Sequence, residues 1–122
     1  MGTPMNGKIE LKIEQENGVT VVIIHTPRVM VDMGESLENE VVHEMLKIAN
    51  PKILLDFSDV QFISSAILGK LIKLNARVAV ERNGQFKICK LSDRIAEVFR
   101  ITGLEKLFQI YKTKAEALAD FK

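Results

Sequence analysis

The sequence predicts a single α/β domain built on a mixed, mostly parallel sheet with an antiparallel hairpin at its start. The length of 122 residues suits one compact domain over 1–122 and leaves no room for a second. A hydrophobic content of 47% can supply a core, and 27% charged residues suit a soluble surface. Strand-like and helix-like segments follow one another in the order ββαβαβαβα, and this alternation is typical of parallel strands joined by crossover helices.

The first two segments are predicted to form a hairpin. Residues 8–15 (KIELKIEQ) alternate charged and aliphatic side chains, as a strand with one face in water does. Asn17-Gly18 follows, and both residues accept the positive φ that a tight hairpin turn needs. Residues 19–24 (VTVVII) are apolar on both faces, so they predict a more central strand.

A helix and a buried strand are expected next. After an irregular stretch over 27–34, Ser36 is in position to cap a helix that Asn50-Pro51 would end. Its apolar stripe would consist of Leu37, Val41, Met45 and Ile48. Residues 52–57 (KILLDF) then predict a short buried strand, parallel to the one before it because a helix lies between them.

A second helix is predicted over 65–82 and is expected to end at Asn83-Gly84, which tolerates the left-handed conformation. Its inward stripe would be Ile67, Leu71, Leu74 and Val78, and its polar stripe Lys70, Lys73, Arg77 and Glu81. The remaining elements are a strand over 85–91, a helix from Ser92 to Gly103, a short strand over 107–111, and a final helix opened by the capping-box spacing of Thr113 and Glu116.

Composition excludes several classes of protein. Seventeen basic and sixteen acidic side chains leave a formal charge of +1, which argues against binding nucleic acid through bulk charge. Cys89 is the only cysteine, so no disulfide framework or thiol metal cluster is expected, and a cytoplasmic setting is the simple interpretation. No apolar run reaches the roughly 18 residues of a membrane span. The opening MGTPMNG lacks the pattern of a signal peptide.

The usual catalytic templates find little support. His43 lies in VVHEML, which lacks the second histidine of a zinc-protease pattern, so structural roles are expected for His25 and His43. Cys89 has no histidine near it in sequence and is expected to be a core residue. No glycine-rich phosphate loop is present. The sequence therefore predicts no catalytic residue, no metal site and no cofactor.

Asp56 ends a buried strand, where the phospho-accepting aspartate of a receiver domain would lie. Receiver domains also need an acidic pair after their first strand to hold Mg²⁺. Glu14 and Glu16 precede a tight hairpin and are not expected to converge on Asp56. A side chain that caps the following turn is the expected role of Asp56.

Two serines, Ser64 and Ser65, stand where the strand of 52–57 leads into the next helix, in ILLDFSDVQFISSAILGK. A hydroxyl there is expected to cap the helix by accepting a hydrogen bond from one of the free backbone amides of the first turn. The same hydroxyl could also be a nucleophile or the acceptor of a phosphate. No base or oxyanion site lies beside the serines in sequence, so the cap and the phosphate acceptor remain, and they are compatible with each other.

The string ILLDFSDVQFISSAILGKLIKLNARV resembles the signature of anti-sigma factor antagonists, the bacterial branch of the STAS domain superfamily. In that signature a strand ends in Asp-Leu/Phe-Ser, and Asp-Ser-Ser/Thr/Ala-Gly-Leu-Gly opens a helix. NGQFKICKLSDRIAEVFRITGLEKLFQIYKTKAEAL is similar to the C-terminal half of the family. The resemblance covers about residues 8–121. It implies a STAS-like mixed sheet backed by helices.

The resemblance also implies a function in protein binding rather than catalysis. In the family, the dephosphorylated antagonist captures an anti-sigma factor, usually a GHKL-type serine kinase, and so frees a sigma factor. The kinase phosphorylates a serine at the start of the signature helix and a phosphatase reverses the reaction. Ser65 matches this phosphoacceptor, and Ser64 is the second choice.

The chain departs from the signature at three positions: Ser64 replaces Asp, Ala66 replaces a second hydroxyl, and Ile67 replaces Gly. Asp32 is a counterpart of the acidic loop that in the family belongs to the partner-binding face. The residues expected to contact a partner are Asp32, Ser64, Ser65, Ala66, Ile67, Lys70 and Lys73.

Two alternatives to the phosphorylated antagonist remain. The departures are compatible with an unphosphorylated STAS adaptor, in a stress-signalling assembly or bound to the ATPase of a lipid-transporting ABC system. A nucleotide-binding or weakly hydrolytic domain is the other alternative, and no phosphate loop or carboxylate cluster supports it.

Overall fold

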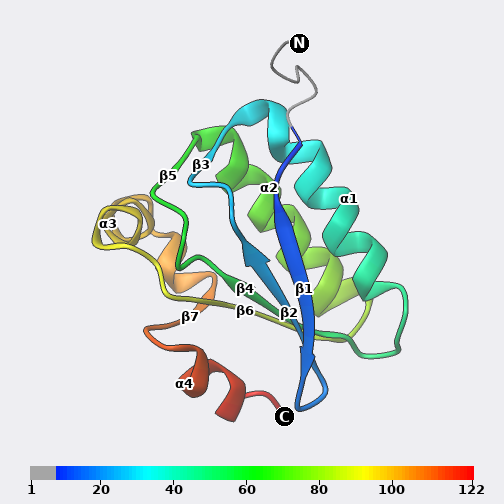
Figure 1. Cartoon of the computed structure of the whole chain (residues 1–122). Coiled ribbons are helices and arrows are strands. Elements are labelled where there is room, and N and C mark those ends of the chain that lie inside the picture. Colours follow the sequence, from blue (N-terminus) through cyan, green and yellow to red (C-terminus); the bar gives the residue numbers. More distant parts are fainter. Residues whose placement is uncertain (1–7) are drawn as a thin grey trace.

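The structure is a computed structural model that describes residues 8–122, so the expectation that MGTPMNG is not a signal peptide lies outside the described residues. A five-stranded sheet in the order β1-β2-β4-β6-β7 forms the centre, and a two-stranded sheet of β3 and β5 lies beside it (Figure 1). The strands are β1 Leu11–Glu16, β2 Val19–Ile24, β3 Arg28–Val29, β4 Lys52–Asp56, β5 Phe62–Ile63, β6 Gln85–Cys89 and β7 Gln109–Tyr111. The helices are α1 Gly34–Met45, α2 Ser65–Ala76, α3 Asp93–Thr102 and α4 Lys114–Ala119.

The predicted fold class is confirmed by the strand pairing. β1 is antiparallel to β2, and the turn between them has Asn17 at φ 55° and Gly18 at φ 78°. The pairs β2–β4, β4–β6 and β6–β7 are all parallel. The predicted order of elements holds, with β3 and β5 as short additions that no sequence pattern indicated.

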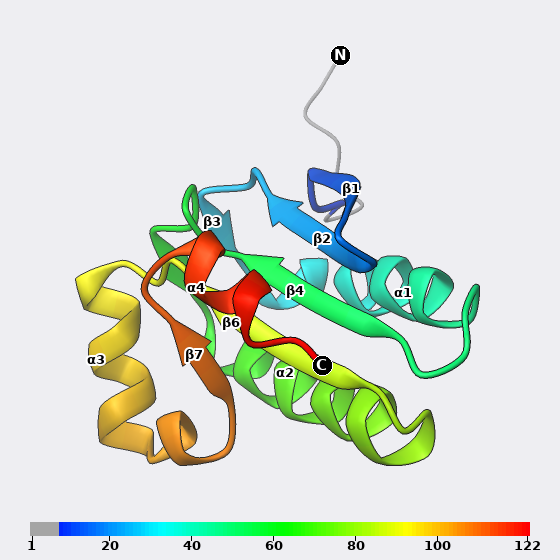
Figure 2. The ribbon, with the colours of Figure 1, turned by 90° about the horizontal axis from the view of Figure 1, so that it is seen from below.

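The sheet has two faces with different cores. α1, α2 and α3 bury the larger core, which includes Val22, Leu55 and Phe99, each with at most 1% of its surface exposed. α4 covers the opposite face, where the smaller core includes Val21 and Leu54 (Figure 2). The apolar residues of β2 therefore face a core on both sides, as its uninterrupted apolar sequence predicted.

Helix ends were predicted with mixed success. Ser92 accepts a hydrogen bond from the Ile95 amide at 3.2 Å, and Gly103 ends α3 at φ 79°, as expected. The predicted cap at Ser36 was wrong, because α1 begins two residues earlier after a 3₁₀ turn over Val31–Met33. α1 also ends at Met45, so Ile48 lies beyond the helix with 43% of its surface exposed.

The second helix continues past α2 as a π-helical turn over Arg77–Glu81 before Asn83 turns the chain at φ 53°. Ile67, Leu71, Leu74 and Val78 face the core with at most 1% of their surface exposed. The predicted apolar stripe is therefore confirmed from Ile67 to Val78.

Two glycines in these elements give a matched test of packing. A Cβ at Gly84 would lie 2.3 Å from the carbonyl oxygen of Pro51, whereas a Cβ at Gly69 would have open space around it. Gly84→Ala is expected to lower the free energy of unfolding by about 2 kcal/mol or more, because backbone must move. Gly69→Ala is expected to raise it by about 1 kcal/mol through helix propensity. Urea unfolding of both variants measures the difference, and equal effects would contradict this packing.

Candidate functional site

The two serines lie at the edge of the molecule where β3 and β5 pair. Asp56 ends β4, and its carboxylate accepts from the Ser58 amide at 2.8 Å, which confirms the turn-capping role. β5 then runs parallel to β3, and the Ser64 amide donates to the Val29 carbonyl at 3.0 Å. The start of α2 is thereby fixed to the segment that follows β2.

The two hydroxyl groups differ in accessibility. Ser64 has the extended backbone of an N-cap residue, and its carbonyl accepts from the Ile67 amide at 3.0 Å. Its Oγ is buried and has no hydrogen-bond partner among residues 8–122. Ser65, the first residue of α2, is exposed. The predicted side-chain cap is therefore wrong for Ser64, because its buried hydroxyl makes no hydrogen bond to the first-turn amides.

The expected partner-binding residues divide into two groups. Asp32, Ser65 and Ala66 are exposed, and the 3₁₀ turn that carries Asp32 packs against α2, so they share one end of the molecule. Ile67 has 1% of its surface exposed and belongs to the core. Its side chain is not available to a partner, so the expectation that it makes contact is corrected: replacing the family's glycine with isoleucine adds core volume instead.

Lys70 and Lys73 are both held by Glu38 of α1. The Lys70 Nζ lies 2.8 Å from one Glu38 oxygen, and the Lys73 Nζ lies 3.3 Å from the other. The hydrogen bond from Lys70 lowers the pKa of the Glu38 carboxyl below its ordinary value. The Lys70 stem also lies against α1, since a Cβ at Gly34 would be 3.2 Å from it. Lys70 therefore joins two helices, while Lys73 keeps a 60% exposed side chain.

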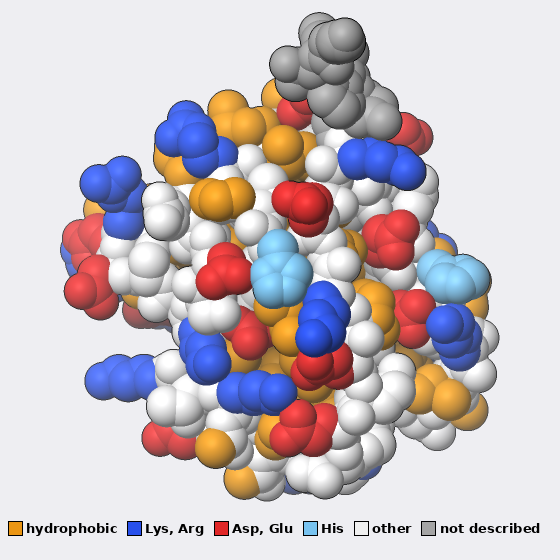
Figure 3. All heavy atoms as spheres, in the orientation of Figure 1, with side chains coloured by type: hydrophobic (Ala, Val, Ile, Leu, Met, Phe, Trp, Pro, Cys, Tyr) orange, Lys and Arg blue, Asp and Glu red, His pale blue; other side chains and the backbone are white. Residues whose placement is uncertain are grey.

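An apolar surface surrounds the serine junction, and the sequence analysis missed it. Val31 is 64% exposed, and Met30, Phe62 and Ile63 are half-buried beside it. Figure 3 shows hydrophobic side chains gathered over this end of the molecule, with basic side chains next to them. The available signal was the run RVMV, whose apolar residues belong to no helical or alternating pattern.

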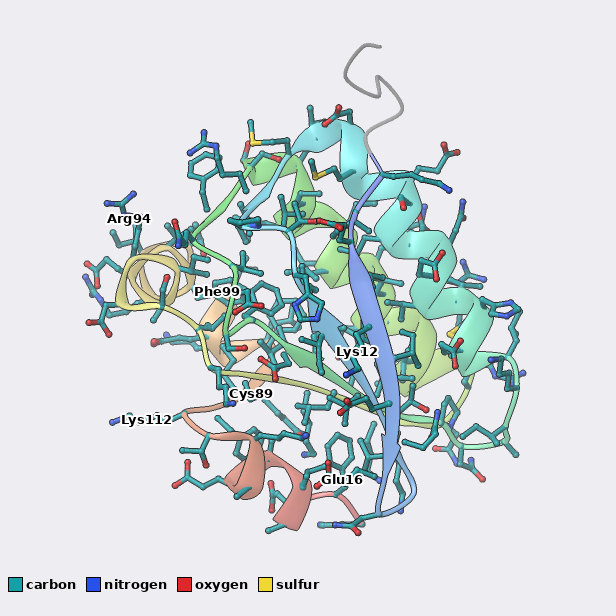
Figure 4. All side chains as sticks on the ribbon, viewed as in Figure 1. Lys12, Glu16, Cys89, Arg94, Phe99 and Lys112 are labelled. Atoms are coloured by element: carbon teal, nitrogen blue, oxygen red, sulfur yellow. The ribbon has the colours of Figure 1, made fainter. Side chains whose placement is uncertain are left out.

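Cys89 and His25, which the sequence analysis considered as possible reactive groups, lie in environments that suit structural roles. Burial, with a contribution from the charge of Asp56, raises the pKa of the Cys89 thiol to about 12, so the thiol stays protonated at neutral pH. Figure 4 shows Cys89 inside the molecule, whereas Arg94 and Lys112 project outward. The Nδ1 of His25 lies 2.8 Å from an oxygen of Asp59 at the surface. Within residues 8–122 no group of three or more His, Cys, Asp or Glu side chains is arranged to hold a metal ion.

A buried polar cluster under α4 was also missed. Lys87, with 3% of its surface exposed, donates to Gln109 and to the Tyr111 hydroxyl, and its Nζ is 3.6 Å from a carboxylate oxygen of Asp120. Its Nζ also lies 5.1 Å from the centre of the Phe121 ring. Burial and a hydrogen bond to Asp120 raise the pKa of Tyr111 to about 12. The cluster fastens the C-terminal segment to the sheet.

Comparison with known proteins identifies the family. The family model of the STAS domain matches residues 10–117, so this chain belongs to the STAS domain family and the resemblance seen in the sequence is confirmed. The candidate anti-sigma factor antagonist BtrV of Bordetella bronchiseptica is 31% identical over 89 residues, which cover 73% of this chain and 75% of that protein. No helix within 8–122 is long and apolar enough to cross a membrane.

Solved structures share the fold. An anti-sigma factor antagonist (STAS) domain protein from Planctomyces limnophilus superposes with a TM-score of 0.81 at 25% identity, over 89% of this chain and 95% of that chain. The phosphorylated form of the Bacillus cell fate determinant SpoIIAA superposes with a TM-score of 0.65 at 15% identity, over 90% of this chain and 97% of that chain.

The two N-cap serines of this chain provide one test of the site geometry. Ser64→Ala is expected to change the free energy of unfolding by less than about 0.5 kcal/mol, because the Ser64 hydroxyl makes no hydrogen bond. Ser92→Ala should lower it by about 1 kcal/mol, because it removes a formed cap. Urea unfolding compares the two variants. A loss at Ser64 as large as that at Ser92 would show that the Ser64 hydroxyl caps α2.

The Glu38 cluster predicts a pH-dependent stability. A carboxyl whose pKa is lowered by folding stabilises the folded state above its unfolded pKa, and this contribution is lost as the pH falls through the folded pKa. Lys70→Met is therefore expected to lower the free energy of unfolding by about 1 kcal/mol at neutral pH, and by progressively less in acid. Lys73→Met, at the more exposed position, should lower the free energy of unfolding by less than Lys70→Met does. Unfolding measured from pH 7 to pH 3 tests this, and a Lys70→Met effect that does not vary with pH would contradict it.

Proposed function

We propose that this protein is an anti-sigma factor antagonist that captures an anti-sigma factor with serine-kinase activity and is released from it when Ser65 is phosphorylated. The protein would act as a binding module and not as an enzyme, and a serine phosphatase would restore the binding form. The observation that carries the proposal is that Ser65, the first residue of α2, is exposed and lies beside an exposed apolar surface. The relationship to BtrV and to the Planctomyces limnophilus protein supports this class of partner.

The accessibility of the serines favours Ser65 over Ser64 as the phosphoacceptor. A kinase must reach the hydroxyl oxygen, and the Ser64 Oγ is buried while Ser65 is exposed. SpoIIAA, which has the same fold, has been solved in a phosphorylated form, so the fold is compatible with a phosphate. Phosphorylation of Ser64 would first require that its buried Oγ become exposed.

A phosphate on Ser65 would act at the interface rather than on the fold. It adds about −1.5 to −2 charges at pH 7, and the start of a helix accepts negative charge because its first amides are free. The domain is therefore expected to stay folded. A partner surface fitted to a neutral hydroxyl would have to bury an unpaired dianion, at a cost of several kcal/mol. Such a cost corresponds to a loss of about a thousandfold or more in affinity.

A constitutive STAS adaptor is the second candidate function. Ala66 and the buried Ile67 replace a hydroxyl and a glycine of the family signature, and Ser64 replaces its aspartate. Ser64 and Ala66 are the immediate neighbours of Ser65 in the segment that a kinase would have to bind. An adaptor would use the same apolar surface with no phosphate, so incubation with a cognate serine kinase and labelled ATP separates the two functions.

The phosphorylation switch predicts a specific pair of variants. Ser65→Asp should weaken binding to the anti-sigma factor at least tenfold, because it places a charge in the contact surface. Ser65→Ala should bind as the wild type does and should fail to incorporate phosphate. Calorimetric titration with the anti-sigma factors encoded in the same genome measures both affinities.

Thermal unfolding provides the control for this pair. Ser65→Asp is expected to melt within a few degrees of the wild type, because acidic residues are tolerated in the first turn of a helix. Unchanged binding by Ser65→Asp would contradict the switch. Phosphate incorporation into Ser65→Ala would show that another residue is the acceptor.

A further inference from the structure

Arg28 is a cation that the folded chain holds in place without neutralising it. It is exposed, and the carbon of its guanidinium group lies 4.7 Å from the centre of the Phe62 ring. No carboxylate within residues 8–122 forms an ion pair with Arg28. Lys70, Lys87 and Lys114, in contrast, each lie within 4.0 Å of an acidic side chain.

The backbone explains why the guanidinium group stays over the ring. Arg28 and Phe62 are partners in the register of β3 and β5, so their side chains leave neighbouring strands at the same level. An arginine stacked on an aromatic face is attracted to the ring and keeps its hydrogen-bond donors free at its edge. The side chain has therefore already lost part of its conformational freedom before any partner arrives, and binding through it costs less entropy.

The surroundings of Arg28 are those of a binding hot spot. Met30, Val31 and Ile63 give an apolar surface next to the stacked pair, and Val31 is 64% exposed. Arginine and aromatic residues in a patch that loses water on binding contribute most of the affinity of many interfaces. A guanidinium group buried there without an acidic partner would instead weaken binding.

We infer that the partner covers this surface with an apolar segment that presents an aspartate or glutamate to the guanidinium group of Arg28. This inference rests on the proposed function, since it specifies how the captured anti-sigma factor is recognised. Charge complementarity selects the partner chemistry: the fixed charge is positive, its donors are arranged for a carboxylate, and the neighbouring surface is apolar. An acidic residue of the partner close to Ser65 would also be repelled by a phosphate there.

Substitution of Arg28 tests the inference. The purified anti-sigma factors encoded in the same genome serve as probes, and calorimetry identifies the one that binds the wild type. Arg28→Glu is expected to weaken that binding at least thirtyfold. Arg28→Lys keeps the charge but cannot stack on the ring or contact a carboxylate in a bidentate way, so its affinity should fall about tenfold. Phe62→Leu keeps an apolar side chain but removes the aromatic face under Arg28, so its affinity should fall several-fold.

Lys112→Glu is the matched control. Lys112 is exposed, has no ion pair within residues 8–122 and lies at the end of β7, away from this surface, while the change in net charge equals that of Arg28→Glu. It is expected to change affinity less than threefold. Substituting the partner's acidic residues one at a time with lysine should reveal one position that restores binding to Arg28→Glu.

The outcomes separate the two levels of inference. Arg28→Glu and Lys112→Glu variants of equal affinity, both with normal melting temperatures, would overturn the role of Arg28 and leave the proposed function standing. Failure of the wild type to bind any anti-sigma factor would overturn both.

Discussion

Backbone hydrogen bonds between the segment after β2 and the segment after β4 hold the candidate site together. The Pro27 carbonyl accepts from the Gln61 and Phe62 amides, and the Val29 carbonyl accepts from the Ser64 amide. These few bonds fix the start of α2, place the Arg28 side chain over a ring, and keep the apolar residues of the 3₁₀ turn at the surface. Because they involve main-chain atoms, the side chains above them are free to vary with the partner.

The site also shows how one helix serves two requirements. The inward stripe of α2 and the lysine held by Glu38 anchor the helix to the sheet and to α1, so its first residue has a fixed position. Its exposed stripe begins with Ser65 and continues through Gly69, where an added Cβ would have open space around it. A rigid inner face and an unoccupied outer face are what a docking helix needs, since preorganisation reduces the entropy lost on binding.

Periodicity predicted most of the fold because each long element has one buried face. The Asn17-Gly18 hairpin, the stripe of Ile67 to Val78 and the end of α3 at Gly103 follow from local chemistry alone. The site was predicted less well because it depends on contacts between segments far apart in sequence. Nothing local indicates that the Ser64 hydroxyl is buried, that Lys70 reaches Glu38, or that Arg28 and Val29 form a strand with residues that follow β4.

The position of Lys87 has a consequence for the synthesis of the chain. Within residues 8–122, α4 is the helix that covers the face of the sheet carrying Val21 and Leu54, and it follows every strand in the chain, so it is synthesised after them. Until then these side chains form an open apolar surface of the kind that promotes association between nascent chains. A lysine in the middle of that surface keeps it from being continuously apolar, much as charged gatekeeper residues flank aggregation-prone strands. Once α4 and the residues after it have been synthesised, Asp120 and Phe121 neutralise and cover this charge, so Lys87 both protects the nascent chain and secures the folded domain.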